Sequence, residues 1–127
     1  MKNKLQFKPV LKWTFYSAFG VLLITGVGWL FQPLPWMMKV HGAAAMVSLM
    51  TLGWLIPTHI IRGWVSKKNR LGGIVILATC GILVVTGYGL YYFGGDVVRA
   101  TTSGIHWGLG VAFPVILIGH IVAGRKP

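Results

Sequence analysis

Long apolar runs alternate with short polar segments along the whole chain. Four runs contain no lysine, arginine, aspartate or glutamate, and they cover residues 13–31, 40–61, 71–95 and 100–124. A helix that crosses a bilayer needs about 20 apolar residues, so each run is long enough to span a membrane. The pattern therefore predicts four membrane-spanning helices and leaves little chain for a further domain.

Short connections decide how these helices are arranged. Residues 32–39 hold two prolines, residues 62–70 form a basic turn, and a third connection begins at Gly94 and contains Asp96 as a solvated loop residue. We expect that connection to end at a helix cap among residues 101–103. Because short loops make consecutive helices antiparallel neighbours, the fold class is predicted to be all-α, an up-down-up-down four-helix bundle. It forms a single domain over residues 1–127, with no linker, repeat or low-complexity segment.

Composition agrees with a membrane protein, and the charge distribution predicts its orientation. Hydrophobic residues make up 55% of the chain and charged residues 10%, which excludes an ordinary soluble globule. The net charge of +11 indicates membrane orientation rather than nucleic-acid binding, because cytoplasmic loops are rich in lysine and arginine. Only Lys39 and Arg99 lie on one side of the predicted bundle. The other side holds ten basic residues, namely Lys2, Lys4, Lys8, Lys12, Arg62, Lys67, Lys68, Arg70, Arg125 and Lys126. We therefore expect a multi-pass protein of the bacterial inner membrane with both termini in the cytoplasm.

All four histidines lie in apolar runs, two in the second run and two in the fourth. Ionisable side chains are costly in a membrane, which favours a functional role for them. His41 and His59 are 18 residues apart, or five whole turns of a helix, and His106 and His120 are 14 apart, within about 40° of one face. The second and fourth helices run in the same direction across a diagonal of roughly 13 Å. We therefore pair His41 with His106 and His59 with His120, each pair as the two metal ligands of one haem iron.

Residues near the histidines complete the predicted site. Gly73 and Gly87 lie about four turns apart on the third helix, close to the two histidine levels, and glycine allows a flat macrocycle to approach a helix closely. Lys39 and Arg99 run against the charge bias, so they are candidates to neutralise haem propionates. General helix packing also explains any single glycine.

The chain resembles the bacterial membrane b-type cytochromes, which have two histidines on helix 2 and two on helix 4. The resemblance is closest to small stand-alone four-helix proteins and covers nearly the whole chain. It is carried by residues 39–46 (KVHGAAAM), 57–64 (PTHIIRGW), 86–92 (TGYGLYY) and 106–110 (HWGLG). It implies non-covalently bound haem b and a role in electron transfer. We expect two haems. One haem is the alternative, because the two histidine intervals differ by about one turn, and both pairs can be brought level only by bending near Pro57 and Pro114.

Other interpretations remain open. A single-haem carrier on the periplasmic side is one, and a haem-free anchor or assembly subunit whose histidines only join helices is another. An electron-transfer protein or redox-complex subunit is favoured over a stand-alone enzyme. The expected partners are the lipid bilayer and a redox protein on the periplasmic side. A quinone is a further candidate, although no acid–base group is placed to handle quinone protons.

Overall fold

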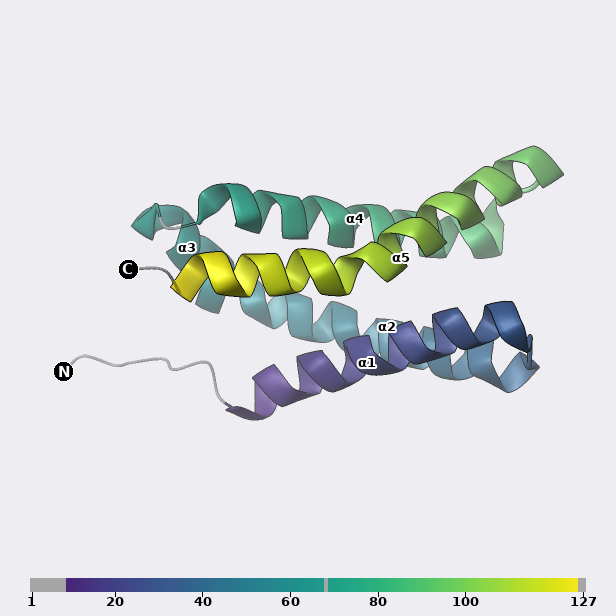
Figure 1. Ribbon diagram of the computed structural model, residues 1–127, viewed down its shortest axis with the longest axis horizontal. Helices are drawn as coiled ribbons and strands as arrows, with labels where there is room; N and C mark the ends of the chain where they lie inside the picture. The colour runs from purple at the N-terminus through teal and green to yellow at the C-terminus, as the bar shows by residue number, and fades with distance from the viewer. Residues whose placement is uncertain (1–8, 68, 126–127) are drawn as a thin grey trace. The chain divides into compact units, whose positions relative to one another are not determined.

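The described part of the chain, residues 9–67 and 69–125 of a computed structural model, is almost entirely helical and contains no strand. The predicted all-α fold class is confirmed. The basic residues Lys2, Lys4, Lys8, Lys68 and Lys126 lie outside the described residues. The elements are α1 (Pro9–Phe31), α2 (Pro35–Leu55), the π-helical turn η1 (Ile56–Ile60), α3 (Ile61–Ser66), α4 (Arg70–Tyr92) and α5 (Asp96–Arg125) (Figure 1).

The chain divides into two compact units, Met1–Ser66 and Lys67–Pro127. In the first hairpin α1 packs against α2, and in the second hairpin α4 packs against α5. Each hairpin has a turn end, where its two long helices are joined, and an open end, where they begin and finish (Figure 1). That these hairpins form one domain stays a prediction.

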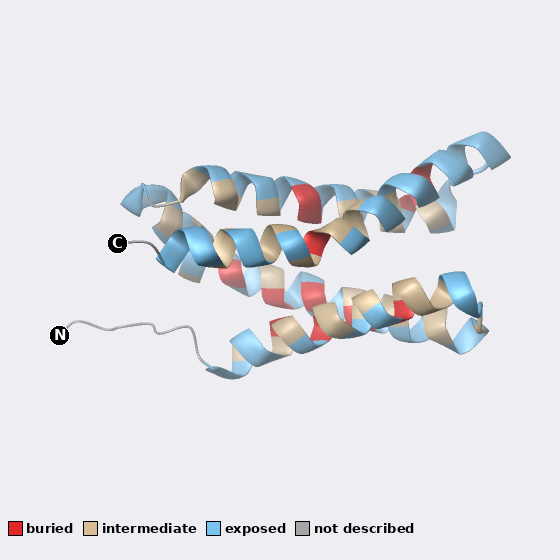
Figure 2. Ribbon diagram, in the orientation of Figure 1, coloured by how far each residue is buried: buried red, intermediate tan, exposed pale blue. Residues whose placement is uncertain are grey.

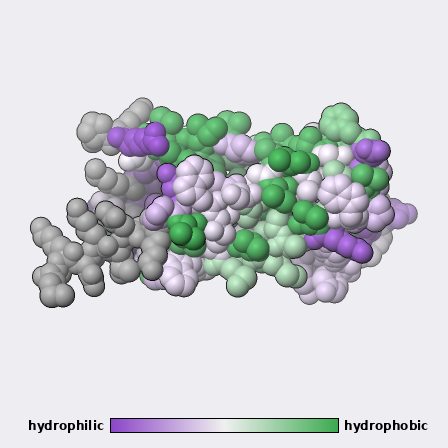
Figure 3. Space-filling view, turned by 90° about the horizontal axis from the view of Figure 1, so that it is seen from below, coloured by the Kyte–Doolittle hydropathy of each residue, from purple (hydrophilic) through white to green (hydrophobic). Residues whose placement is uncertain are grey.

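Four helical segments of the described chain are long and apolar enough to cross a membrane: Pro9–Phe31, Pro35–Ser66, Arg70–Tyr92 and Asp96–Arg125. The second segment is the continuous run of α2, η1 and α3. Hydrophobic side chains dominate the middle of the surface seen in Figure 3, and hydrophilic ones gather toward its ends. The chain is thus compatible with a multi-pass membrane protein.

Helix starts differ from the prediction in ways that local chemistry explains. α2 begins at Pro35, after Leu34 in an extended conformation, so Lys39 belongs to the helix and not to the connection. A proline at the first helical position is favourable because its missing N–H would have no partner there. α5 begins at Asp96, where a carboxylate is favoured by the partial positive charge of a helix N-terminus. The predicted cap at residues 101–103 and the loop position of Asp96 are therefore wrong.

Pro57 lies in a single π-helical turn within the second membrane-length segment. Proline lacks the N–H that would donate to the preceding turn, and its ring clashes with the carbonyl four residues earlier. Here the Ile61 N–H donates to the Ile56 carbonyl, five residues back, and the Thr58 hydroxyl donates to the Trp54 carbonyl at 2.8 Å. Pro114, by contrast, lies inside α5, which remains α-helical around it.

The two hairpins repeat one pattern. α1 and α4 each contain 23 residues. Residues 25–28 (TGVG) and 86–89 (TGYG) stand at the same place in these two helices. Equivalent backbone bonds close the two helices, from Gln32 N–H to the Gly28 carbonyl at 2.9 Å and from Phe93 N–H to the Gly89 carbonyl at 2.7 Å. This correspondence between the hairpins was not predicted.

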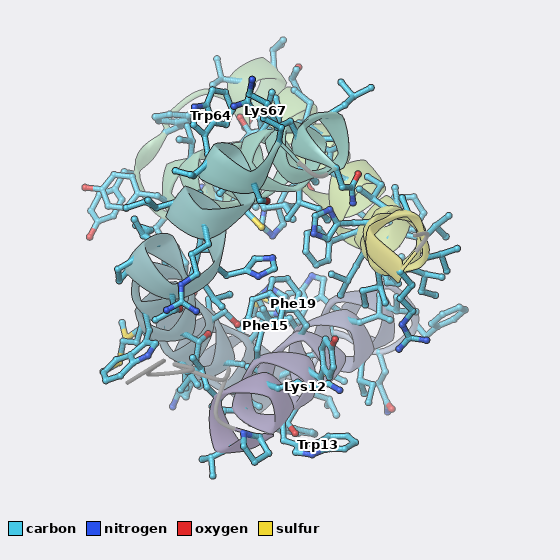
Figure 4. All side chains as sticks on the ribbon, turned by 90° about the vertical axis from the view of Figure 1, so that its left-hand side faces the viewer. Lys12, Trp13, Phe15, Phe19, Trp64 and Lys67 are labelled. Atoms are coloured by element: carbon cyan, nitrogen blue, oxygen red, sulfur yellow. The ribbon has the colours of Figure 1, made fainter. Side chains whose placement is uncertain are left out.

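Small and hydroxyl-bearing residues make up much of the buried surface, which is typical of membrane helices that approach one another closely (Figure 2). On α2 the buried positions are Ala44, Ser48, Thr51 and Leu55, a spacing that defines one helix face. Their hydroxyls donate to carbonyls of the preceding turn. On α1 the ring of the buried Phe15 packs against that of Phe19, with the centroids 4.6 Å apart and the planes tilted by 48°. The exposed Trp13 lies on the opposite side of the helix (Figure 4).

Candidate functional site

In the first hairpin, His41 of α2 lies against α1 close to the turn end. Its Nδ1 atom is 2.8 Å from Oγ1 of Thr25, which is buried. The same hydroxyl lies 2.6 Å from the carbonyl oxygen of Val21, one turn earlier in α1. A Cβ atom built on Gly26 would lie 3.5 Å from Cε1 of His41. The Thr-Gly pair therefore binds one side of the imidazole and leaves room for its ring.

The second hairpin repeats this arrangement around His106 of α5. Its Nδ1 atom is 2.9 Å from Oγ1 of Thr86, and that hydroxyl lies 2.6 Å from the Ile82 carbonyl. A Cβ atom on Gly87 would lie 3.1 Å from Cε1 of His106. Gly87 thus lies beside the imidazole of its own hairpin. Its role in making room for a macrocycle stays a prediction.

Counting protons assigns the tautomer of both histidines. A threonine hydroxyl has one proton to donate, and a carbonyl oxygen can only accept. At 2.6 Å the hydroxyl–carbonyl distance is that of a short O–H···O bond in both hairpins, so the hydroxyl proton belongs there. The hydroxyl oxygen then accepts the Nδ1–H of the imidazole. This assignment leaves Nε2 of His41 and of His106 as the ring nitrogen that carries a lone pair.

His120, near the open end of the second hairpin, has a different partner and the opposite tautomer. The Nδ2 atom of Asn69 lies 2.9 Å from the His120 carbonyl oxygen and 3.2 Å from its Nδ1 atom. Because the carbonyl only accepts, the amide must present its NH₂ group on this side, and its second N–H is directed at Nδ1. His120 Nδ1 is then an acceptor, and the proton of the neutral ring is on Nε2.

Asn69 is itself placed by the start of α4. It has a left-handed backbone conformation with φ of 50°, which asparagine adopts more readily than most residues, and its carbonyl accepts the Gly73 N–H at 3.0 Å. Asn69 and His120 line a pocket of about 260 Å³ together with residues of α4 and α5. A Cβ atom on Gly73 would meet no atom within 4 Å, so this glycine faces open space.

His59 lies in the π-helical turn and is exposed. The predicted common face of His41 and His59 assumed an uninterrupted α-helix between the two residues. A π-helical turn takes up more residues than an α-helical one, so η1 shifts His59 out of that register. The assumption of five whole turns is wrong, whereas the assignment of His59 as a ligand stays a prediction.

The two candidate propionate partners are not equivalent. Lys39 is exposed and lies two residues before His41 in α2. Arg99 lies seven residues before His106, about 10 Å along the helix axis. Its Nη1 donates to the Leu90 carbonyl at 2.7 Å, which satisfies a carbonyl in the last turn of α4. Arg99 thus has a structural role in joining α4 to α5.

Sequence reasoning missed Thr25, Thr86 and Asn69. The Thr-Gly-x-Gly motif was the available signal for the two threonines, because it occurs once in the helix before His41 and again in the helix before His106. Asn69 gave no comparable signal, since its contact with His120 joins residues far apart in the sequence and depends on a left-handed turn.

Within residues 9–67 and 69–125, no group of three or more His, Cys, Asp or Glu side chains comes together in a way that could hold a metal ion. No family model matches the chain, and neither a curated protein nor a solved structure matches it. The resemblance to membrane b-type cytochromes therefore rests on the motifs and on the histidine positions.

Proposed function

We propose that this chain is a membrane b-type cytochrome that carries single electrons through haem b. His41 and His106 would hold one haem, and His59 and His120 would hold a second. The observation that supports this most strongly is the matched pair of hairpins, each of which holds one imidazole by Nδ1 against a threonine.

The donor set fits a bis-histidine haem. A metal-ligating histidine usually donates its other ring N–H to a protein oxygen, which fixes both the tautomer and the ring orientation. His41 and His106 have this arrangement, with Thr25 and Thr86 as acceptors.

Bound haem would supply a one-electron iron couple, and the protein would set its environment. The histidines hold the iron, and the apolar helices keep water away from it. Lys39 supplies a positive charge close to the His41 level, suited to a propionate. Arg99 is the weaker candidate of the two because it already binds a backbone carbonyl.

The second haem is proposed to be held more weakly than the first. Asn69 donates to Nδ1 of His120, so that Nε2 carries the ring proton and must lose it before ligating a metal. His59 is displaced from the face of His41 by the π-helical turn. A carrier with the His41/His106 haem alone is the corresponding single-haem form of the proposal.

The charge pattern supports an orientation for each hairpin. In the described residues the open ends carry Lys12 and Arg62 in one hairpin and Lys67, Arg70 and Arg125 in the other, whereas the turn ends carry Lys39 and Arg99. By the positive-inside rule both termini lie in the cytoplasm of a bacterial inner membrane. The His41/His106 haem would then lie on the periplasmic side, where it exchanges electrons with a redox protein or a quinone.

A second function is favoured by the same hydrogen bonds. The Thr25–His41 and Thr86–His106 contacts each join two helices, as polar side chains commonly do in membrane bundles. A haem-free anchor or assembly subunit would use them for this purpose alone.

Absorbance and haem stoichiometry of the purified protein test these alternatives. We expect the sharp α band of low-spin bis-histidine haem b in the reduced protein, and a pyridine haemochrome assay should give up to two haems per chain. His41→Ala and His106→Ala should each remove the same spectral component, because both ligate one iron. His59→Ala and His120→Ala should remove the other, which is also the first to be lost in detergent.

The contrary results are specific. Protein purified from haem-replete cells without any haem would leave the anchor or assembly role. Loss of different components in His41→Ala and His106→Ala would show that the ligands are paired differently. One haem per chain that is unaffected by His59→Ala and His120→Ala would establish the single-haem form.

A further inference from the structure

Thr25 and Thr86 stand in the same relation to a histidine in two separate hairpins. We infer that they are positioning residues that keep the imidazole proton of His41 and of His106 on Nδ1, and thereby select Nε2 as the metal-ligating nitrogen. The tautomer part of this inference concerns the apoprotein, and only its effect on haem rests on the proposed function.

The hydroxyl is held as an acceptor by its own helix. Thr25 donates to Val21 at 2.6 Å and Thr86 to Ile82 at 2.6 Å, each to the carbonyl four residues earlier. To donate to an imidazole nitrogen instead, the hydroxyl would have to give up that bond inside an apolar segment. Two oxygens 2.6 Å apart with no proton between them would repel, so the hydroxyl keeps donating to the carbonyl and the imidazole must supply the proton of the other bond.

The backbone bond alone is a common feature of this chain. Thr14 donates to the Val10 carbonyl and Thr79 to the Val75 carbonyl, both at 2.8 Å. Thr14 lies on nearly the same face of α1 as Thr25, and Thr79 on nearly the same face of α4 as Thr86. Thr25 and Thr86 differ from Thr14 and Thr79 because each also lies within hydrogen-bond distance of an imidazole. Thr14 and Thr79 are therefore matched controls.

A glycine follows the threonine on both helices and allows the imidazole to approach. Gly26 and Gly87 directly follow the threonines, and the imidazole Cε1 atoms lie 3.5 and 3.1 Å from where their Cβ atoms would be. The hydroxyl therefore sets the proton position while the neighbouring glycine allows the ring to approach the helix. The threonine and the glycine recur together at the same place in the second hairpin, which argues that the two residues act jointly on the imidazole.

The first test reads the tautomers without haem. Full-length apoprotein in detergent micelles, labelled with ¹⁵N-histidine, is measured by NMR, and single His→Gln variants assign the ring signals. We expect protonated Nδ1 and bare Nε2 for His41 and His106, and the reverse for His120, which serves as an internal reference. Thr25→Val should weaken the preference at His41 only, and Thr86→Val at His106 only, while Thr25→Ser and Thr86→Ser should retain it. Wild-type protein with Nε2–H at His41 and His106 would overturn the inference without any variant.

The second test measures haem affinity and midpoint potential of the reconstituted protein. Loss of an outer hydrogen-bond partner typically weakens metal binding by about 10- to 100-fold, and we expect this range for Thr25→Val and for Thr86→Val. The midpoint potential should rise, because a ligand that no longer donates Nδ1–H is less basic and stabilises ferric iron less. The serine variants should restore both values, and Thr14→Val and Thr79→Val should leave both unchanged.

The two tests separate failure of the inference from failure of the proposed function. Haem-free protein with the expected tautomers would exclude the cytochrome role and retain the role of the threonines in the apoprotein. Haem-binding protein whose affinity, potential and tautomers are unaffected by both valine substitutions would exclude the threonines as positioning residues and retain the cytochrome.

Discussion

At Gly87 the absence of a side chain leaves space that the imidazole of His106 fills. The site of a Cβ atom there is 3.1 Å from Cε1 of His106, which is closer than an ordinary van der Waals contact. The equivalent distance from Gly26 to His41 is 3.5 Å, which such a contact tolerates. The two hairpins therefore differ in how tightly they hold their histidines.

We expect Gly87→Ala to destabilise the protein by about 1–3 kcal/mol, the usual cost of overpacking a close contact. Gly26→Ala should cost clearly less. Gly81→Ala is the matched control on α4, because its Cβ atom would meet nothing within 4 Å and alanine is a better helix former than glycine by up to about 1 kcal/mol. Thermal unfolding of the three variants in one detergent provides the comparison. Equal losses for Gly87→Ala and Gly81→Ala would contradict the contact with His106.

The histidines were predictable from the sequence as candidate ligands, whereas their hydrogen-bond partners were not. An imidazole in an apolar run is conspicuous because of its polarity. A threonine is not conspicuous, since its hydroxyl can donate to a backbone carbonyl of the preceding turn and the residue is then compatible with any membrane helix. The assignment of Gly87 to a macrocycle stays a prediction, because spacing places a glycine at a level but does not say which groups share the space beside it.

At the scale of elements, the π-helical turn at Pro57 is the main departure from regular α-helix. A π-helical turn inside an α-helix is frequently found at a functional site, and this one contains His59. Its cause is local, because a proline cannot donate to the turn before it.

Pro57→Ala should restore the N–H and convert the segment to continuous α-helix. The face presented by every residue after the turn then rotates. Cysteine-scanning labelling of residues 61–66 in a Cys80→Ala background should show its pattern of accessible positions displaced by about one residue, the difference between a π-helical and an α-helical turn. Pro114→Ala is the control and should leave the labelling pattern of residues 118–123 unchanged, because α5 is already α-helical there. An unchanged pattern in Pro57→Ala would mean that the turn has another cause.

Helix existence was predictable for all four segments, because a charge-free apolar run of this length has few alternatives. The ends were harder to predict. The charge-free runs begin at residues 13, 40 and 100, but the helices begin earlier, at Pro9, Pro35 and Asp96. Proline and aspartate are favourable residues in the first turn of a helix. The correspondence between the hairpins was not evident because the interval from His41 to His59 is longer than the interval from His106 to His120, so the second helices of the hairpins do not align along their length.

At the scale of the whole molecule, orientation is the property that the charge pattern makes testable. Reporter fusions at Gln32 and Gly95 should give a periplasmic signal, and a fusion at Lys67 a cytoplasmic one, if the open ends of both hairpins lie in the cytoplasm as the positive-inside rule predicts. Exchange of Lys39 and Arg99 for glutamine should not alter these signals, since the bias is already strong. A cytoplasmic signal at Gly95 would contradict four crossings.

In the proposed orientation, the basic open ends of the two hairpins would have a consequence for the surrounding lipid. The chain contains twelve lysines and arginines and a single acidic residue, so its own side chains offer almost no countercharge. Anionic headgroups of the cytoplasmic leaflet attract each such cation by about 1 kcal/mol near the surface. A ring of acidic phospholipid is therefore expected to gather around this protein, which makes the composition of the leaflet part of what holds its helices at their depth.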